Sequence, residues 1–148
     1  MSLDLRTRAL QLLARREHAR AELARKLSAH AESEEQLDAL LDTLERERLL
    51  SDTRYAEARV NTRSARYGNA RLVQELRTQG VSESDVEVAL QGINDELSRA
   101  RQVWERKYGS GGLPADASER ARQTRFLLGR GFSGNTIRRI LRGNFEDE

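Results

Sequence analysis

The sequence predicts an all-α protein built from three tandem three-helix repeats in an elongated array. The 148-residue chain contains a single proline, so long helices are unbroken. It has no alternating run of β-branched residues of the kind that indicates a strand. Charged residues make up 34% of the chain and hydrophobic residues 37%. That is too little apolar surface for one thick core, but it suits thin helical modules that share apolar surface with their neighbours.

An internal repeat runs through the chain. Three segments superimpose without gaps at offsets of about 49 and then about 51 residues. Their apolar columns predict core positions at helical spacing. A column of serines predicts helix N-caps, because a Ser hydroxyl accepts an N–H of the first helical turn. The columns are Leu27, Leu76 and Leu127; Leu37, Val86 and Ile137; Leu40, Ala89 and Ile140; Leu41, Leu90 and Leu141; and Ser33, Ser82 and Ser133.

Each repeat is expected to hold a leading helix and then a helical pair, with repeats at 1–50, 51–94 and 95–148. The second leading helix follows a Ser51-Asp52 cap. Gly80 and Gly131 are suited to end the second helix of their repeats, whereas Ala31 is a weaker cap. The stretch from 109 to about 116, beginning GSGGLP, is predicted to be a mobile loop. Apolar residues of the leading helices are Leu5, Ala9, Leu12 and Leu13; Tyr55, Ala56 and Val60; and Leu97, Ala100, Val103, Trp104 and Tyr108.

Basic side chains supply the main functional signal. The net charge is only +2, but acids dominate residues 32–47, and residues 120–142 carry arginines and no acid. Arginine forms planar, bidentate contacts with phosphate. A stripe of arginines therefore favours contact with nucleic acid or with an acidic protein surface, although a solvated helix face stays open. The candidate contact residues are Arg63, Arg66, Arg71, Arg77, Arg122, Arg125, Arg130, Arg138, Arg139 and Arg142.

Residues for catalysis or metal binding are scarce. The chain has no cysteine and two histidines, His18 and His30, which we expect at the surface or at helix ends. The glycines at 109–112 follow no predicted strand, so a phosphate-binding loop is not indicated. We therefore expect no enzyme, no cofactor and no metal. Trp104, Phe126 and Phe132 are assigned to the core, and the role of Tyr67 stays open.

The residues alone leave three functions open. The first is a protein that binds DNA without sequence specificity. The second is a helix-turn-helix transcription factor, because paired short helices with a Gly turn occur in such proteins. The third is a helical adaptor with no nucleic-acid role. No signal peptide and no apolar run of membrane-spanning length is evident, so we expect a cytoplasmic protein without a membrane partner. A monomer is favoured because no long apolar seam is left over.

Four strings, taken in order, resemble the repeats of the RecX family over nearly the whole chain. They are ARAELARKL at 19–27, LSDTRYA at 50–56, GNARLVQELRTQGV at 68–81 and FLLGRGFSGNTIRRIL at 126–141. The ordered set is more specific than any single string. One departure is visible, because the family often has Ser where this chain has Ala19. The lost N-cap is expected to cost about 0.5–2 kcal/mol of local helix stability.

The resemblance implies a curved, elongated array of three repeats and a role in homologous recombination, DNA repair and the SOS response. RecX proteins bind the groove of the RecA–DNA filament and also contact DNA. The expected DNA partner is single-stranded DNA, with double-stranded DNA as a second candidate. They inhibit the recombinase, ATPase and coprotease activities of RecA by blocking filament growth or destabilising the filament. The family has no set of catalytic residues to carry over, so the candidate arginines come from the charge pattern alone.

Overall fold

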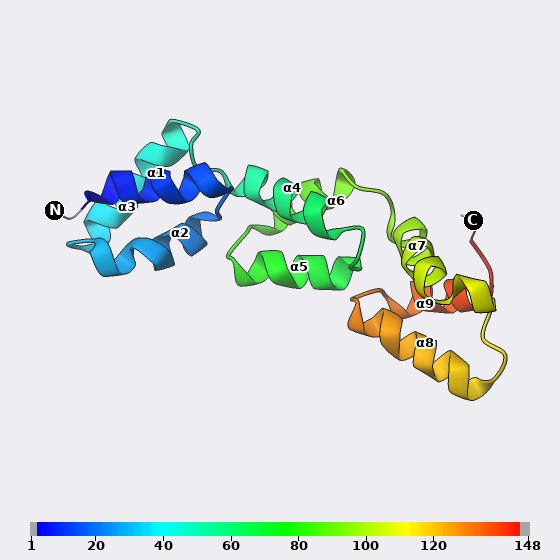
Figure 1. Cartoon of the computed structure of the whole chain (residues 1–148). Helices are drawn as coiled ribbons and strands as arrows, with labels where there is room; N and C mark the ends of the chain where they lie inside the picture. The colour runs from blue at the N-terminus through cyan, green and yellow to red at the C-terminus, as the bar shows by residue number, and fades with distance from the viewer. Residues whose placement is uncertain (1–2, 146–148) are drawn as a thin grey trace. The chain divides into compact units, whose positions relative to one another are not determined.

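The computed structural model describes residues 3–145, which form nine α-helices, two short 3-10 turns and no strand (Figure 1). The predicted all-α class is confirmed. Three helices fall within each predicted repeat, while the boundaries of the repeats remain a prediction. The helices are α1 (Leu5–Arg15), α2 (Arg20–Leu27), α3 (Glu34–Arg46), α4 (Asp52–Arg63), α5 (Asn69–Thr78), α6 (Glu83–Gln91), α7 (Glu96–Tyr108), α8 (Ala117–Gly129) and α9 (Gly134–Leu141), and the 3-10 turns are η1 (Ser28–His30) and η2 (Gly109–Gly111).

Serine and aspartate caps fix where the helices begin. The hydroxyls of Ser33, Ser82 and Ser133 accept the backbone N–H three residues later at 3.1, 3.2 and 3.2 Å. The serine column of the repeat is thus confirmed as a set of N-caps for α3, α6 and α9. Carboxylates do the same for α1, α7 and α8, from Asp4, Asp95 and Asp116.

The chain folds into two compact units. One comprises the residues up to Arg59 together with Leu76–Ala89, and the other comprises Val60–Glu75 and the residues from Leu90 onward. The predicted apolar columns are buried throughout, apart from Leu40 and Leu90, which are half-buried. The core of the first unit contains Leu5, Ala9, Leu23, Leu27, Leu37, Leu41, Leu44 and Leu50. The core of the second contains Leu97, Ala100, Val103, Trp104, Tyr108, Leu127, Phe132, Ile137, Ile140 and Leu141.

Both units contain the same glycine turn. Gly80 and Gly131 have φ of +77° and +89°, in the left-handed region that glycine adopts without strain. In the first unit a Cβ on Gly80 would lie 3.1 Å from the Cβ of Ala21 in α2, and in the second a Cβ on Gly131 would lie 2.4 Å from that of Arg71 in α5. Glycine therefore ends the helix, as predicted, and also lets the turn approach a helix of the preceding repeat.

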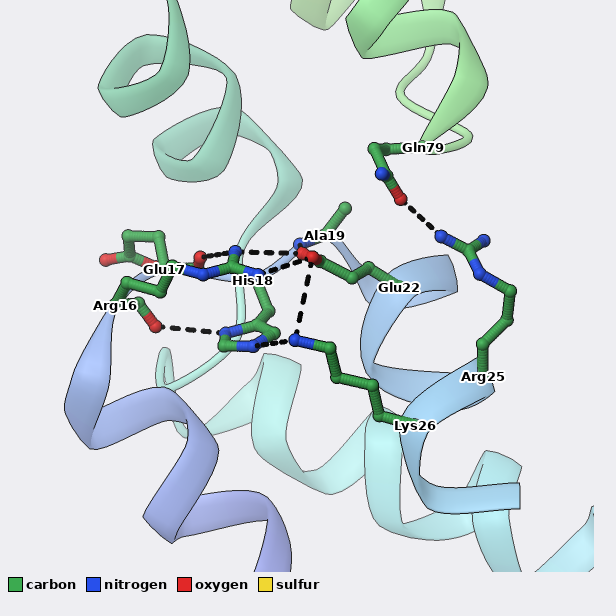
Figure 2. Close-up of polar contacts among 8 residues, drawn as sticks. All are labelled: Arg16, Glu17, His18, Ala19, Glu22, Arg25, Lys26 and Gln79. Carbon is green, nitrogen blue, oxygen red and sulfur yellow. Dashed lines mark hydrogen bonds and ion pairs between the residues drawn. The ribbon is translucent and has the colours of Figure 1, made fainter. Parts of the chain in front are cut away.

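The connection between α1 and α2 carries a polar network within the first unit (Figure 2). The Glu22 carboxylate accepts two hydrogen bonds from Arg16, at 2.6 and 3.1 Å, and lies 3.8 Å from the ammonium of Lys26. Burial raises the pKa of the Glu22 carboxyl, but the hydrogen bonds and charge of Arg16 outweigh it, so the net pKa lies below the usual range. Glu22 is held ionised where the chain enters α2.

His18 lies at a helix end, as predicted, but it is buried rather than at the surface (Figure 2). Its Nδ1 lies 3.1 Å from the carbonyl oxygen of Arg16 and its Nε2 lies 3.1 Å from the ammonium of Lys26. Because an ammonium can only donate, Nε2 accepts and Nδ1–H donates, which is a neutral imidazole. Burial lowers the pKa of His18. His30 is exposed in η1.

The N-terminus of α2 finds partners in place of the missing serine. Ala19 has no side-chain acceptor, but its own backbone N–H donates to Glu22 Oε1 at 3.4 Å. The backbone N–H of Arg20 donates to the carboxylate of Asp52 at 2.7 Å. An acceptor from the start of α4 thus satisfies one of the N–H groups that open the helix.

The stretch after α7 begins as the 3-10 turn η2 and leaves it through Gly112, whose φ is +71°. Its predicted mobility remains a prediction. Among residues 3–145, every helix is too short or too polar to cross a lipid bilayer.

Candidate nucleic-acid interface

The predicted arginines do not form one continuous cluster. Arg77 belongs to the first unit and the other nine to the second. Within the second unit, Arg66 and Arg130 line one open pocket. Arg142 lines a different pocket together with Arg101, and Arg122 lines a third beside η2. The remaining positions are Arg63 in α4, Arg71 in α5, Arg125 in α8, and Arg138 and Arg139 in α9.

Tyr67 organises three of the predicted arginines. The guanidinium carbons of Arg63, Arg71 and Arg130 lie 4.4, 4.3 and 5.4 Å from the centroid of its ring. A guanidinium this close to an aromatic ring is attracted by the negative ring face. The tyrosine whose role the sequence left open is thus the centre of an arginine cluster.

Close backbone contact holds this cluster in place. The N–H of Gly68 donates to the carbonyl of Arg130 at 2.7 Å, and the N–H of Ala70 donates to the carbonyl of Gly131 at 3.2 Å. A Cβ on Gly68 would lie 2.3 Å from the Gly131 carbonyl oxygen, so only glycine fits there. The connection between α4 and α5 is therefore docked directly on the turn between α8 and α9.

Arg99 secures the same connection from inside. Its side chain is buried and donates to the carbonyls of Ser64, Tyr67 and Asn94 at 3.2, 2.7 and 2.8 Å, and to the side-chain oxygen of Asn69. Burial lowers its pKa, but an arginine remains charged at neutral pH. Sequence reasoning missed Arg99, because helical spacing alone does not distinguish it from the exposed arginines of α7.

Several predicted arginines are paired with carboxylates. Arg63 donates two hydrogen bonds to Glu75, at 2.6 and 2.7 Å, and Glu75 also lies 3.7 Å from Arg71. Arg77 forms a similar bidentate pair with Glu83 in the first unit. These hydrogen bonds raise the pKa of Arg63 and of Arg77 and lower the pKa of Glu83. Arg122 lies 3.6 Å from Glu119. The positive charges of Arg63, Arg71, Arg77 and Arg122 are therefore partly neutralised by carboxylates of the protein itself.

The pocket beside Tyr67 is different, because it gathers cations without carboxylates. It has a volume of about 490 Å³ and is lined by Arg66, Tyr67, Val103, Arg106, Lys107, Phe126 and Arg130. We call it the basic pocket. Among residues 3–145, no carboxylate lies within ion-pair distance of any of its four cations. Arg106 and Lys107 escaped sequence reasoning, since they lie outside the acid-free stretch and Glu105 precedes them.

Phe126 belongs only partly to the core to which the sequence assigned it. Trp104 and Phe132 are buried, as predicted. Phe126 is half-buried and packs against the core, with its ring perpendicular to that of Tyr108 at 5.6 Å. It also lines the basic pocket, where the Lys107 ammonium lies 4.4 Å and the Arg130 guanidinium carbon 5.2 Å from its ring centroid. One ring thus serves both the core and the pocket.

A metal site is not visible in the part of the chain that the structure describes, where no three His, Asp or Glu side chains group together. The basic pocket can bind a polyanion electrostatically, because its guanidinium and ammonium groups are donors with no carboxylate partner among residues 3–145.

Comparisons with known proteins identify the repeats. A family model described as "RecX, third three-helix domain" matches residues 94–141, and one described as "RecX, second three-helix domain" matches residues 51–90. A "Regulatory protein RecX" of Ralstonia nicotianae is 51% identical over 95% of this chain and 88% of its own length. Another, of Herminiimonas arsenicoxydans, is 44% identical over 100% of this chain and 97% of its own length. The crystal structure of RecX from Lactobacillus salivarius shares the fold, with a TM-score of 0.81, 22% identity, and coverage of 95% of this chain and 94% of that one.

Proposed function

Because the chain belongs to the RecX family, we propose that it is a negative regulator of RecA that binds the RecA–DNA filament. The relatives' shared name, regulatory protein RecX, supports a regulatory role rather than a catalytic one. The single observation that carries the DNA part of the proposal is the basic pocket, whose four cations have no carboxylate partners within the described residues.

The filament offers this protein two kinds of surface. DNA presents phosphates to unneutralised cations such as those of the basic pocket. RecA subunits present a repeating protein surface, which suits a protein that is itself built from repeats. The acids of α3, among them Glu34, Glu35 and Asp38, are exposed and suit a basic partner surface. Many modest contacts along a periodic track add through effective concentration.

Binding of this protein to the filament would itself inhibit RecA, by either of two routes. A protein bound across DNA and RecA at a filament end obstructs the next subunit, which blocks growth. A protein bound along the filament can instead favour dissociation of the subunits, which shortens filaments already formed. Both routes lower the recombinase, ATPase and coprotease activities, since all three depend on the assembled filament.

Filament length over time tests the proposal and separates the routes. RecA is assembled on fluorescently labelled single-stranded DNA, the protein is added, and individual filaments are followed by microscopy. Arrest of growth at constant length supports blocking, and shortening supports destabilisation. Filaments that grow at the uninhibited rate with saturating protein contradict both. Binding that depends on a particular DNA sequence would support a helix-turn-helix reader instead.

A further inference from the structure

The basic pocket concentrates positive charge that no carboxylate of residues 3–145 neutralises. Arg66, Arg106, Lys107 and Arg130 all line the same open pocket of about 490 Å³. Like charges held this close repel one another, and an anionic ligand relieves that repulsion. Elsewhere in the second unit, Arg63 and Arg71 have Glu75 beside them. An anion bound in the pocket therefore meets several cations that have no carboxylate partner among residues 3–145.

Three of the four cations of the pocket are held in place by contacts within the second unit. Arg106 donates to the carbonyl of Ala65 at 2.8 Å, and Arg130 donates to the carbonyl of Arg66 at 3.4 Å. The Lys107 ammonium lies 4.4 Å from the ring centroid of Phe126. Each group keeps further N–H donors, because a guanidinium has five and an ammonium three. Donors already in place lose little conformational entropy when a ligand binds.

A second pocket, with a volume of about 320 Å³, lies beside η2 and shares Lys107 with the basic pocket. Its other cation, Arg122, lies 3.6 Å from Glu119, which lines the same pocket. The basic pocket is therefore the better site for an anion. Its aromatic lining, from Tyr67 and Phe126, also suits unpaired bases, because base–aromatic contact adds to binding without reading sequence.

We propose that the basic pocket binds the phosphodiester backbone of single-stranded nucleic acid, with phosphates at Arg66, Arg106, Lys107 and Arg130. This assignment rests on the proposed function, since it locates the DNA contact of that function. A single strand fits the concave pocket because its backbone can bend into it and expose its bases, whereas a duplex keeps its bases stacked inside.

The salt dependence of binding by the protein alone, without RecA, tests the pocket. Affinity for a fluorescently labelled oligo(dT) is measured by anisotropy across a range of salt concentrations. The double variant Arg106→Gln with Lys107→Gln should lower the slope of log affinity against log salt by about 1.4, or about 0.7 for each lost phosphate contact. Both residues are exposed, and thermal melting checks that the variant folds. Arg6→Gln is the matched control, because Arg6 is an exposed arginine paired with Glu47; it should leave the slope unchanged.

An unchanged slope in the folded double variant, or a wild-type protein that binds no oligo(dT) at low salt, would overturn the proposal. A second arm uses a blunt duplex of equal length. If the double variant reduces the salt-dependence slope equally for the single strand and for the duplex, the assignment of the pocket to single strands is wrong. Inhibition of RecA by the same variant is measured separately, so failure of the pocket and failure of the proposed function give different patterns.

Discussion

The guanidinium carbon of Arg71 lies 4.3 Å from the ring centroid of Tyr67, and that of Arg63 lies 4.4 Å from the same centroid. Two arginines from different helices, α5 and α4, are thus drawn to one aromatic side chain in the connection between them. The ring keeps their guanidinium groups near the basic pocket that Tyr67 itself lines.

Replacing Tyr67 with leucine should weaken binding to oligo(dT), because the aromatic ring that lines the basic pocket is lost. Contact between a base and an aromatic ring is worth about 1–3 kcal/mol, so the loss should lower affinity at least several-fold. Tyr67→Phe keeps the ring and should bind nearly as well as wild type. Equal loss in both variants would mean that the hydroxyl, rather than the ring, matters.

Gly68→Ala should destabilise the second unit, because the new methyl group would lie 2.3 Å from the carbonyl oxygen of Gly131. Forcing extra atoms into a packed site costs about 1–3 kcal/mol. Chemical denaturation measures the free energy of unfolding. Gly129→Ala is the matched control, since nothing lies within 4 Å of its added Cβ; that variant should be at least as stable as wild type. Full stability of Gly68→Ala would refute the close approach.

Arg99→Lys should cost about 2–3 kcal/mol of stability even though the charge is kept. A lysine has no planar fork to reach three carbonyls and an amide oxygen, and hydrogen bonds to charged groups are worth about 1.5–3 kcal/mol each. Arg101→Lys, on the exposed side of the same helix, should change stability little. Urea denaturation measures the free energy of unfolding of both variants. Equal losses in the two variants would contradict the role assigned to Arg99.

The stability of the protein should fall as the pH drops from about 7.5 to about 5.5. Burial lowers the pKa of His18 in the folded state, so the unfolded chain binds a proton first, at its usual pKa of about 6.5. The stabilisation is complete above that pKa and is lost as the pH falls toward the lowered one. Unfolding curves of His18→Gln should depend less on pH over this window, and those of His30→Gln should match wild type. If the free energy of unfolding of His18→Gln depended on pH as strongly as that of wild type, the assignment of a neutral, buried imidazole to His18 would be wrong.

Local patterns were enough to predict the helical class and the serine N-caps. Ser33, Ser82 and Ser133 cap helices because the interaction spans three residues, and Leu27, Leu76 and Leu127 are buried because helical spacing places them on the inner face. Contacts between distant residues were not predictable in this way. Asp52 accepts the N–H of Arg20, so the missing serine at Ala19 is partly compensated from a helix further along the chain.

The candidate site shows the same limit. The acid-free stretch drew attention to Arg130, which lines the basic pocket. It could not indicate Arg106 and Lys107, because a carboxylate nearby in the sequence need not be nearby in space. Glu105 precedes both residues, yet it pairs with Arg101 at 2.9 Å. Tertiary contacts decide which arginines are paired with carboxylates. The order of charges along the sequence does not show these contacts.

The most direct test of the central claim is the DNA-dependent ATPase activity of RecA, measured on filaments preformed on single-stranded DNA while this protein is titrated in. We predict inhibition at well below one protein per RecA subunit, because a regulator that acts on filament ends or on neighbouring subunits need not occupy every one. Full ATPase activity at saturating protein, with DNA in excess so that competition for free strands is excluded, would contradict regulation of RecA.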